Sequence, residues 1–199
     1  MKKIINLLLS TLLLGCGTNS NINLHKPSIN LEEKNIEIKK TIYIDSKFDE
    51  EEKEAIIAAK NEWQLATKEI VKYNLILNYK INLKSPDTKK TVILTLSAKD
   101  NIVQKIDEKV KKEFLTGIVI SEETKLILII SDRISEKESF KRLIIKELGH
   151  ELGINMENNT DSLFIINTNV PNFSCLTKTD LFLFCQKYMC NHEKLNYCN

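Results

Sequence analysis

The sequence predicts a mixed α/β domain of the α+β class, in which a twisted sheet packs against several helices. Short runs of Val, Ile, Leu and Thr that suit strands are separated by longer segments with helical periodicity. Pro86-Asp87 lies between two of the strand-like runs and is typical of a turn. After the apolar N-terminus and a polar stretch, about 160 residues remain, which suits one domain with a sizeable core.

The expected elements begin at residue 41. Strands are expected at residues 41–45, 75–79, 91–96, 117–120 and 126–130. Helices are expected at residues 50–70, which follow Asp49, and at residues 101–114. Ser135 and Glu138 have the spacing of a capping box that opens a third helix, and Gly153 is placed to end that helix. This order predicts a sheet with helices against one face.

Residues 1–15 have the features of a cleaved export signal. Lys2 and Lys3 precede an apolar run of about 11 residues, too short to span a bilayer core, which needs about 20. Leu13-Leu14-Gly15-Cys16 resembles the lipobox of bacterial lipoproteins, in which the cysteine is acylated and becomes the mature N-terminus. We therefore expect an exported protein anchored through lipid on Cys16, at the outer membrane or cell surface; the alternative is an ordinary buried helix.

Residues 16–40 are polar and lack periodicity, which predicts a flexible tether between the lipid and a domain at residues 41–199. The chain has 29 basic and 27 acidic residues, and two of the lysines lie in the signal, so the mature charges balance at 27 each. This balance, without a basic cluster, argues against nucleic acid as a partner.

The cysteines indicate an oxidising location. Apart from Cys16, all of them lie within the last 25 residues, at Cys175, Cys185, Cys190 and Cys198. An even, clustered set in an exported chain predicts two disulfides whose pairing the sequence leaves open. A zinc site built from the four thiolates is the alternative, although no C-x-x-C pair is present.

The segment Lys146-Glu147-Leu148-Gly149-His150-Glu151-Leu152-Gly153 carries the chemistry of the chain. A step of about 100° per residue places Ile144, Ile145, Leu148 and Leu152 together on a helix. Lys146 and His150 then lie near the opposite side, toward solvent or a cleft, with Glu147 beside them. An ordinary amphipathic helix with a solvated polar face would have the same pattern.

This segment resembles the zinc-binding motif of the metzincin peptidases, H-E-x-x-H-x-x-G-x-x-H, and the matrixin-like members most. Glu147, His150 and Gly153 match the motif, whereas Lys146 and Met156 stand where the first and third zinc-binding histidines belong. The resemblance implies that Glu147 is the vestigial general base and that His150 is the one surviving ligand position.

Two later segments extend the resemblance, which covers residues 41–189. Asp161-Ser162-Leu163-Phe164 is similar to the family's Ser-Ile-Met turn, with Phe164 at the methionine position. Leu176-Thr177-Lys178-Thr179-Asp180-Leu181 is similar to the start of the family's C-terminal helix. A metzincin-like fold implies a twisted sheet, a long helix after the first strand, a motif helix and a C-terminal helix.

The departures from the motif argue against zinc as a cofactor. A lysine ammonium about 4 Å from a divalent ion is repelled by roughly 8 kcal/mol at an effective dielectric near 20. Deprotonating Lys146 first costs about 5 kcal/mol near neutral pH, and the Met156 thioether is a poor ligand for zinc. We expect instead that the Lys146 ammonium takes the place of the metal and pairs with Glu147 or a neighbouring carboxylate.

These observations predict a lipoprotein with a non-catalytic metallopeptidase-like domain that binds a peptide or protein. One alternative is an active zinc-dependent metallopeptidase that uses His150, Glu147 and further ligands. His192 could join His150 in such a site, whereas His25 lies in the tether. The other alternative is a structural surface lipoprotein whose helix resembles the motif by chance. No Ser or Cys stands in an arrangement typical of a nucleophile.

Overall fold

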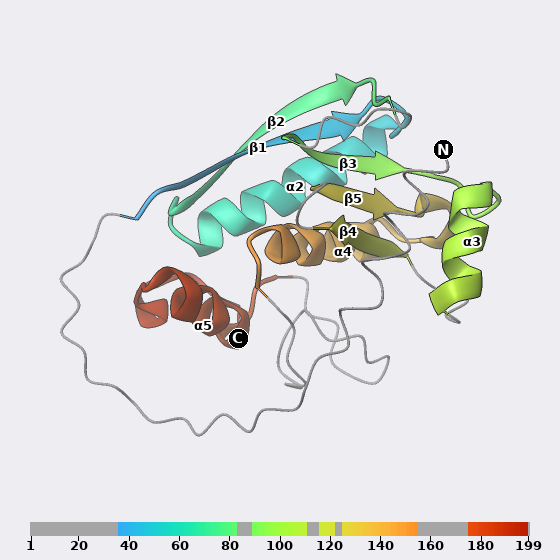
Figure 1. The fold of residues 1–199 in the computed structure, drawn as a ribbon. Helices are drawn as coiled ribbons and strands as arrows, with labels where there is room; N and C mark the ends of the chain where they lie inside the picture. Colours follow the sequence, from blue (N-terminus) through green and yellow to red (C-terminus); the bar gives the residue numbers. More distant parts are fainter. Residues whose placement is uncertain (1–35, 83–88, 111–115, 122–124, 155–174, 199) are drawn as a thin grey trace.

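A five-stranded sheet organises the computed structural model, which describes residues 36–82, 89–110, 116–121, 125–154 and 175–198 (Figure 1). The strands are β1 (Ile38–Asp45), β2 (Val71–Tyr79), β3 (Thr91–Thr95), β4 (Gly117–Ser121) and β5 (Leu126–Ile129). Their order across the sheet is β2-β1-β3-β5-β4. The first four positions are parallel, and β4 alone runs antiparallel to its neighbour. All five predicted strands are confirmed, although β1 and β2 begin earlier than expected.

Among the described residues four α-helices accompany the sheet, so the predicted mixed α/β class is confirmed. They are α2 (Glu50–Ala66), α3 (Asn101–Val110), α4 (Lys137–Glu151) and α5 (Lys178–Tyr188), with 3-10 turns η1 (Ser131–Arg133) and η2 (His192–Lys194). In α2 the Asp49 side chain accepts from the backbone of Glu52, which completes a capping box. The helix ends four residues before the predicted position because Lys68 and Glu69 have left-handed backbones, with φ of 48° and 66°.

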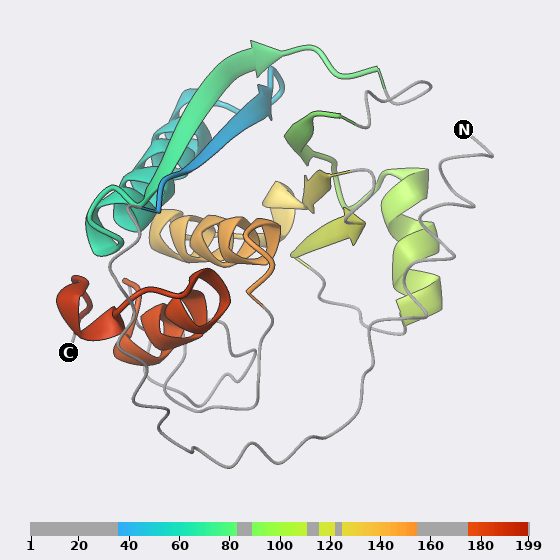
Figure 2. The ribbon, with the colours of Figure 1, turned by 60° about the vertical axis from the view of Figure 1, so that its left-hand side comes forward.

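The helices cover both faces of the sheet, so the expectation that they lie against one face is wrong. On one face Ile93, Ile127 and Ile129 share a core with α2, α4 and α5. On the other face the alternate strand residues form a second core with Val103 and Ile106 of α3. Figure 2 shows α3 set apart from the other helices. Every residue of β3 and β5 is buried, and both strands contain uninterrupted apolar runs, Val92-Ile93-Leu94 and Leu126–Ile129, rather than an alternating pattern.

The start of α4 differs from the predicted capping box. Glu136, not Ser135, is the N-cap residue, and its side chain makes no capping hydrogen bond. Glu136 instead accepts a hydrogen bond from Ser139 Oγ at 3.3 Å. The spacing of Ser135 and Glu138 was correct for a box, but residues before Lys137 remain extended, so the helix begins too late to use it.

The C-terminal segment is held by two disulfides, as the cysteine pattern predicts. Cys175 pairs with Cys198 and Cys185 pairs with Cys190, so the alternative of a four-thiolate zinc site is wrong. The segment also contacts the end of α2, where the backbone N–H of Asn196 donates to Ala66 O at 2.9 Å. Within the part of the chain that is described, each helix is too short or too polar to span a bilayer.

Candidate functional site

The motif helix α4 is fixed from two sides by hydrogen bonds to its backbone. Trp63 Nε1 of α2 donates to Ile145 O at 2.8 Å, and Tyr73 Oη of β2 donates to Leu148 O at 3.2 Å. The Trp63 and Tyr73 side chains are both buried in the larger core. Figures 1 and 2 show α2 and α4 packed side by side. The helix carrying the motif therefore has one defined rotation and height relative to the sheet.

Glu147 is buried, with only 2% of its surface exposed. Its Oε2 atom accepts no hydrogen bond in the described structure. Burial raises the pKa of the Glu147 carboxyl to about 7, while the positive charge of Lys146 acts in the opposite direction. This differs from the expectation of an outward glutamate beside Lys146 and His150. The reason is helical geometry, because Glu147 follows the buried Ile144 by three residues and so shares its face.

His150 is half-buried and its ring is oriented by the backbone beyond the helix. Nδ1 lies 3.2 Å from Ile154 O, and because a carbonyl only accepts, the neutral ring carries its proton on Nδ1. Burial lowers the pKa of His150, the charge of Lys146 lowers it further, and the hydrogen bond to Ile154 opposes both effects. His150 is therefore a neutral imidazole at physiological pH.

Lys146 connects these two groups electrostatically. Its charge lowers the pKa of Glu147 and also lowers the pKa of His150. The Lys146 side chain is half-buried, so this charge acts with less screening than it would in water. The arrangement is a half-buried lysine whose charge acts on a buried carboxyl group and on a half-buried imidazole.

Gly153 ends the motif helix, as the sequence predicts. The backbone N–H of Gly153 donates to His150 O at 2.8 Å, and that of Ile154 donates to Gly149 O at 2.9 Å. These two bonds form a Schellman motif, which requires a left-handed residue after the C-cap. Gly153 supplies this conformation with φ of +69°, and the turn brings Ile154 O to His150.

We expect Gly153→Ala to destabilise the domain by about 1–2 kcal/mol, because alanine is strained at positive φ. An added Cβ would also lie 2.0 Å from Lys187 Nζ, so that side chain must move. Urea unfolding measures the loss. Lys99→Ala is the control, because Lys99 lies in an exposed loop and its replacement changes neither the turn at Gly153 nor the space around Lys187. Leu152→Ala would not serve, because Leu152 is part of the core. Unchanged stability of the Gly153 variant would contradict this account of the turn.

The described residues do not supply the zinc ligands that the family resemblance implies. Lys146 stands in the first ligand position, and His150 is the one imidazole on this helix. His192 packs its ring edge-on against that of Phe182, with 5.1 Å between the ring centroids. Among the described residues no three His, Cys, Asp or Glu side chains are grouped so as to hold a metal ion. Cys16, His25, Met156 and the segment 161–164 lie outside the described residues.

Glu151, which the sequence analysis did not single out, belongs to a second polar cluster at the end of α4. Its side chain is 7% exposed, and Oε1 accepts from Lys40 Nζ at 3.0 Å and from Thr91 Oγ1 at 3.5 Å. Its Oε2 is buried and accepts no hydrogen bond in the described structure. Lys40 is 111 residues from Glu151 in the sequence and Thr91 is 60 residues from it, so no local pattern in the sequence could indicate these contacts.

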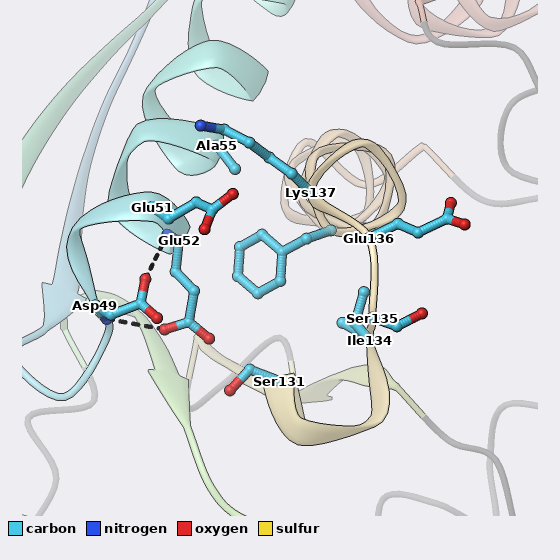
Figure 3. Close-up of a pocket in the computed structure, with 10 residues that line it drawn as sticks. Asp49, Glu51, Glu52, Ala55, Ser131, Ile134, Ser135, Glu136 and Lys137 are labelled. Atoms are coloured by element: carbon cyan, nitrogen blue, oxygen red, sulfur yellow. Dashed lines mark hydrogen bonds between the residues drawn. The ribbon is translucent and has the colours of Figure 1, made fainter.

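A separate pocket of about 160 Å³ lies between the N-terminal ends of α2 and α4 (Figure 3). Asp49, Glu52 and Glu136 contribute carboxylates to its lining. Figure 3 shows Asp49 and Glu52 bonded to each other's backbone. Acidic residues stabilise helix N-termini through the helix dipole, so the structural role of the helix ends accounts for this acidic lining.

No protein-family model matches this chain, and no curated protein matches it in sequence.

Proposed function

We propose that the chain is an exported lipoprotein, anchored through lipid on Cys16, whose metzincin-like domain binds a peptide or protein without hydrolysing it. One observation carries the proposal. The fixed charge of Lys146 acts on both Glu147 and His150, the two groups that would face zinc in an active enzyme of that family.

The order of elements supports a metzincin-like fold. The strand β1 is followed by the long helix α2, then by the remaining strands, the motif helix α4 and the C-terminal helix α5. Two details of the local resemblance have physical roles in the described structure. Gly153 forms the turn after the motif helix, and Thr177 forms a capping box with Asp180 at the start of α5.

The absence of peptide hydrolysis follows from the chemistry of Lys146. A divalent ion at the same place would be repelled by the ammonium, and His150 alone could not offset that repulsion. Without a bound metal, Glu147 has no activated water to deprotonate. Lys146 and His150 can still form part of a binding surface, because α4 holds both side chains in place without a bound metal ion.

Peptide binding is supported by the position of β4. This strand is the outermost one on its side of the sheet, so one side of its backbone makes no hydrogen bonds within the sheet. It also contacts the motif helix α4. An extended peptide can add to such an edge through backbone hydrogen bonds, with nearby pockets supplying specificity. A peptide on this edge would run beside the helix that carries Lys146 and His150.

One observation favours the second candidate function, an active metallopeptidase. The pKa of Glu147 is raised to about 7, which is the range in which a carboxylate works best as a general acid or base. Burial alone explains this value, and a buried glutamate without catalytic work would have the same pKa. The two functions therefore require a direct experiment.

Metal content and hydrolysis distinguish them. We expect the oxidised chain, made as the Cys16→Ser variant, to hold far less than one equivalent of zinc after dialysis against zinc and buffer. We also expect no chelator-sensitive cleavage of fluorescent casein. The Lys146→His variant is the matched comparison, since it restores one ligand and removes the cation. One equivalent of zinc in the unmodified motif, lost in His150→Ala, together with casein cleavage lost in Glu147→Ala, would establish the peptidase instead.

The binding part of the proposal has its own measurement. Titration of the ¹⁵N-labelled chain with a panel of unstructured peptides should shift backbone resonances of β4 and of α4 near His150. Lys146→Ala should change which peptides bind, because it removes the fixed cation, whereas Lys99→Ala should not. If no peptide in the panel shifts these resonances, the domain is better described as a structural surface lipoprotein.

A further inference from the structure

We propose that a pocket at the C-terminal end of α4 binds a compact anionic group, a carboxylate or a phosphate, between Lys40, Lys125 and Lys187. The pocket has a volume of about 270 Å³ and is lined by residues from β1, β3, β5, α4 and α5. It shares His150 with the candidate site but includes neither Lys146 nor Glu147. The inference does not depend on the proposed function, since it concerns a different set of charges.

The charges that line the pocket are unbalanced. The lining contains three lysines but one carboxylate, that of Glu151. Lys40 pairs with Glu151 at 3.0 Å, which leaves the charges of the other two lysines uncompensated within the lining. Converging like charges repel one another, and an anion placed among them relieves the repulsion. The excess of positive charge therefore identifies the ligand as an anion.

The ammonium groups keep hydrogen-bond donors for such a ligand. A lysine ammonium has three donors. Lys40 uses one of them on Glu151 Oε1, and Lys187 uses one on Gly153 O at 2.8 Å. These two hydrogen bonds orient the side chains of Lys187 and Lys40, and each ammonium keeps two further donors for a ligand. The pocket is thus preorganised on two sides.

Gly153 has a second role in this preorganisation. The position of an added Cβ at Gly153 lies 2.0 Å from Lys187 Nζ, so the ammonium occupies the space that any other residue's side chain would fill. The helix-ending turn and the placement of Lys187 therefore depend on the same glycine.

Lys125 immediately precedes β5 and has a left-handed backbone, with φ of 48°. The Lys125 carbonyl accepts from Val92 N at 2.9 Å, which ties this residue to β3. The side chain itself is exposed and lines the pocket.

The remaining walls suit a small ligand rather than a protein surface. Ile127 and Leu152 are 1% exposed each and give the pocket an apolar floor. A few charged groups above an apolar floor are typical of small-molecule sites, where the reduced dielectric strengthens each charged contact. The volume accommodates a phosphate or the carboxylate end of a larger molecule.

Titration of the ¹⁵N-labelled, oxidised Cys16→Ser chain with inorganic phosphate, N-acetylglycine and N-acetylglycinamide tests the proposal. Phosphate, N-acetylglycine or both should give saturable shifts at Lys40, Lys125 and Gly153, and the uncharged amide should give none. Comparing the two anions identifies the preferred class. Lys125→Gln should weaken the affinity roughly fivefold, the effect of one partly exposed charge, while Lys99→Gln leaves it unchanged.

Glu151→Gln separates an anion site from a cation site. Removing the carboxylate should strengthen anion binding severalfold if the lysines hold the ligand. A cation site built on Glu151 Oε2 would instead lose binding in the same variant and would show saturable shifts with calcium or ammonium. Shifts that do not saturate with any of the anions, or an affinity unchanged by Lys125→Gln, would overturn the proposal. Circular dichroism spectra of each variant exclude misfolding as the cause.

Discussion

Replacing Glu147 by glutamine should remove the loss of stability that this carboxyl causes as the pH rises from 4.5 through about 7. Burial raises the pKa of this carboxyl from 4.5 to about 7, so the folded state holds the proton more tightly than the unfolded state does. The resulting stabilisation is fully present below pH 4.5 and is lost as the pH rises through about 7. In the glutamine variant there is no proton to lose.

The expected magnitude is large for a single side chain. Glu147 is only 2% exposed, so solvent screens the effect little. The difference in pKa corresponds to about 3 kcal/mol between acidic and alkaline conditions. Urea unfolding from pH 4 to 9 measures it. The buried amide of glutamine needs hydrogen-bond partners and can cost about 1–3 kcal/mol, but this cost is the same at every pH. The quantity to compare between variants is therefore the slope of the free energy of unfolding against pH, rather than the free energy at any one pH.

His150 contributes to the pH dependence of stability with the opposite sign, and the His150→Gln variant isolates its contribution. Its pKa is lowered from 6.5, so its contribution is present above pH 6.5 and is lost as the pH falls through the lowered value. His150→Gln removes that part and leaves the part due to Glu147. Glu108→Gln, on the exposed surface of α3, is the matched control for removing a carboxylate.

The role of Lys146 makes the test sharper. Its charge lowers the pKa of Glu147, so Lys146→Gln should move the Glu147 titration to higher pH, as carboxyl ¹³C shifts would record. A Glu147→Gln variant whose stability has the same slope against pH as wild type would contradict the burial of an ionisable carboxyl at this position.

Local patterns predicted the elements of the fold because each depends on neighbouring residues. The Asp49 capping box and the left-handed Gly153 are properties of short segments, and both are visible in the sequence. The placement of α3 is not such a property. Its apolar face could have packed on either side of the sheet, and the uninterrupted apolar run Val92-Ile93-Leu94 in β3 was the signal that both sides are covered.

The candidate site was predictable only in part for the same reason. The residue types at 146, 147 and 150 singled out this helix as the candidate site, but they did not indicate how deeply each side chain is buried. The depth of Glu147 depends on α2 and the sheet, which are brought against α4 by contacts such as Trp63 Nε1 to Ile145 O. The cluster of Lys40, Thr91 and Glu151 is formed entirely by contacts between distant segments.

Removing the Cys175–Cys198 disulfide, by replacing both cysteines with serine, should destabilise the domain by about 3 kcal/mol. This bridge closes a sequence separation of 23 residues, whereas Cys185–Cys190 closes one of 5. A larger loop restricts the unfolded chain more, so the double serine variant at Cys185 and Cys190 should lose only about 2 kcal/mol.

The two variants should also differ in where the structure loosens. Cys175–Cys198 holds the last residues beside α2, where Asn196 bonds to Ala66 O and Cys198 N donates to Leu176 O at 3.1 Å. Losing this bridge should speed amide hydrogen exchange at positions 196 and 198, while losing Cys185–Cys190 should affect only the end of α5. Urea unfolding and exchange together measure both effects. Equal losses of stability with unchanged exchange at Asn196 would mean that the noncovalent contacts alone hold the C-terminal segment, because the bridge would then restrain nothing that those contacts do not already fix.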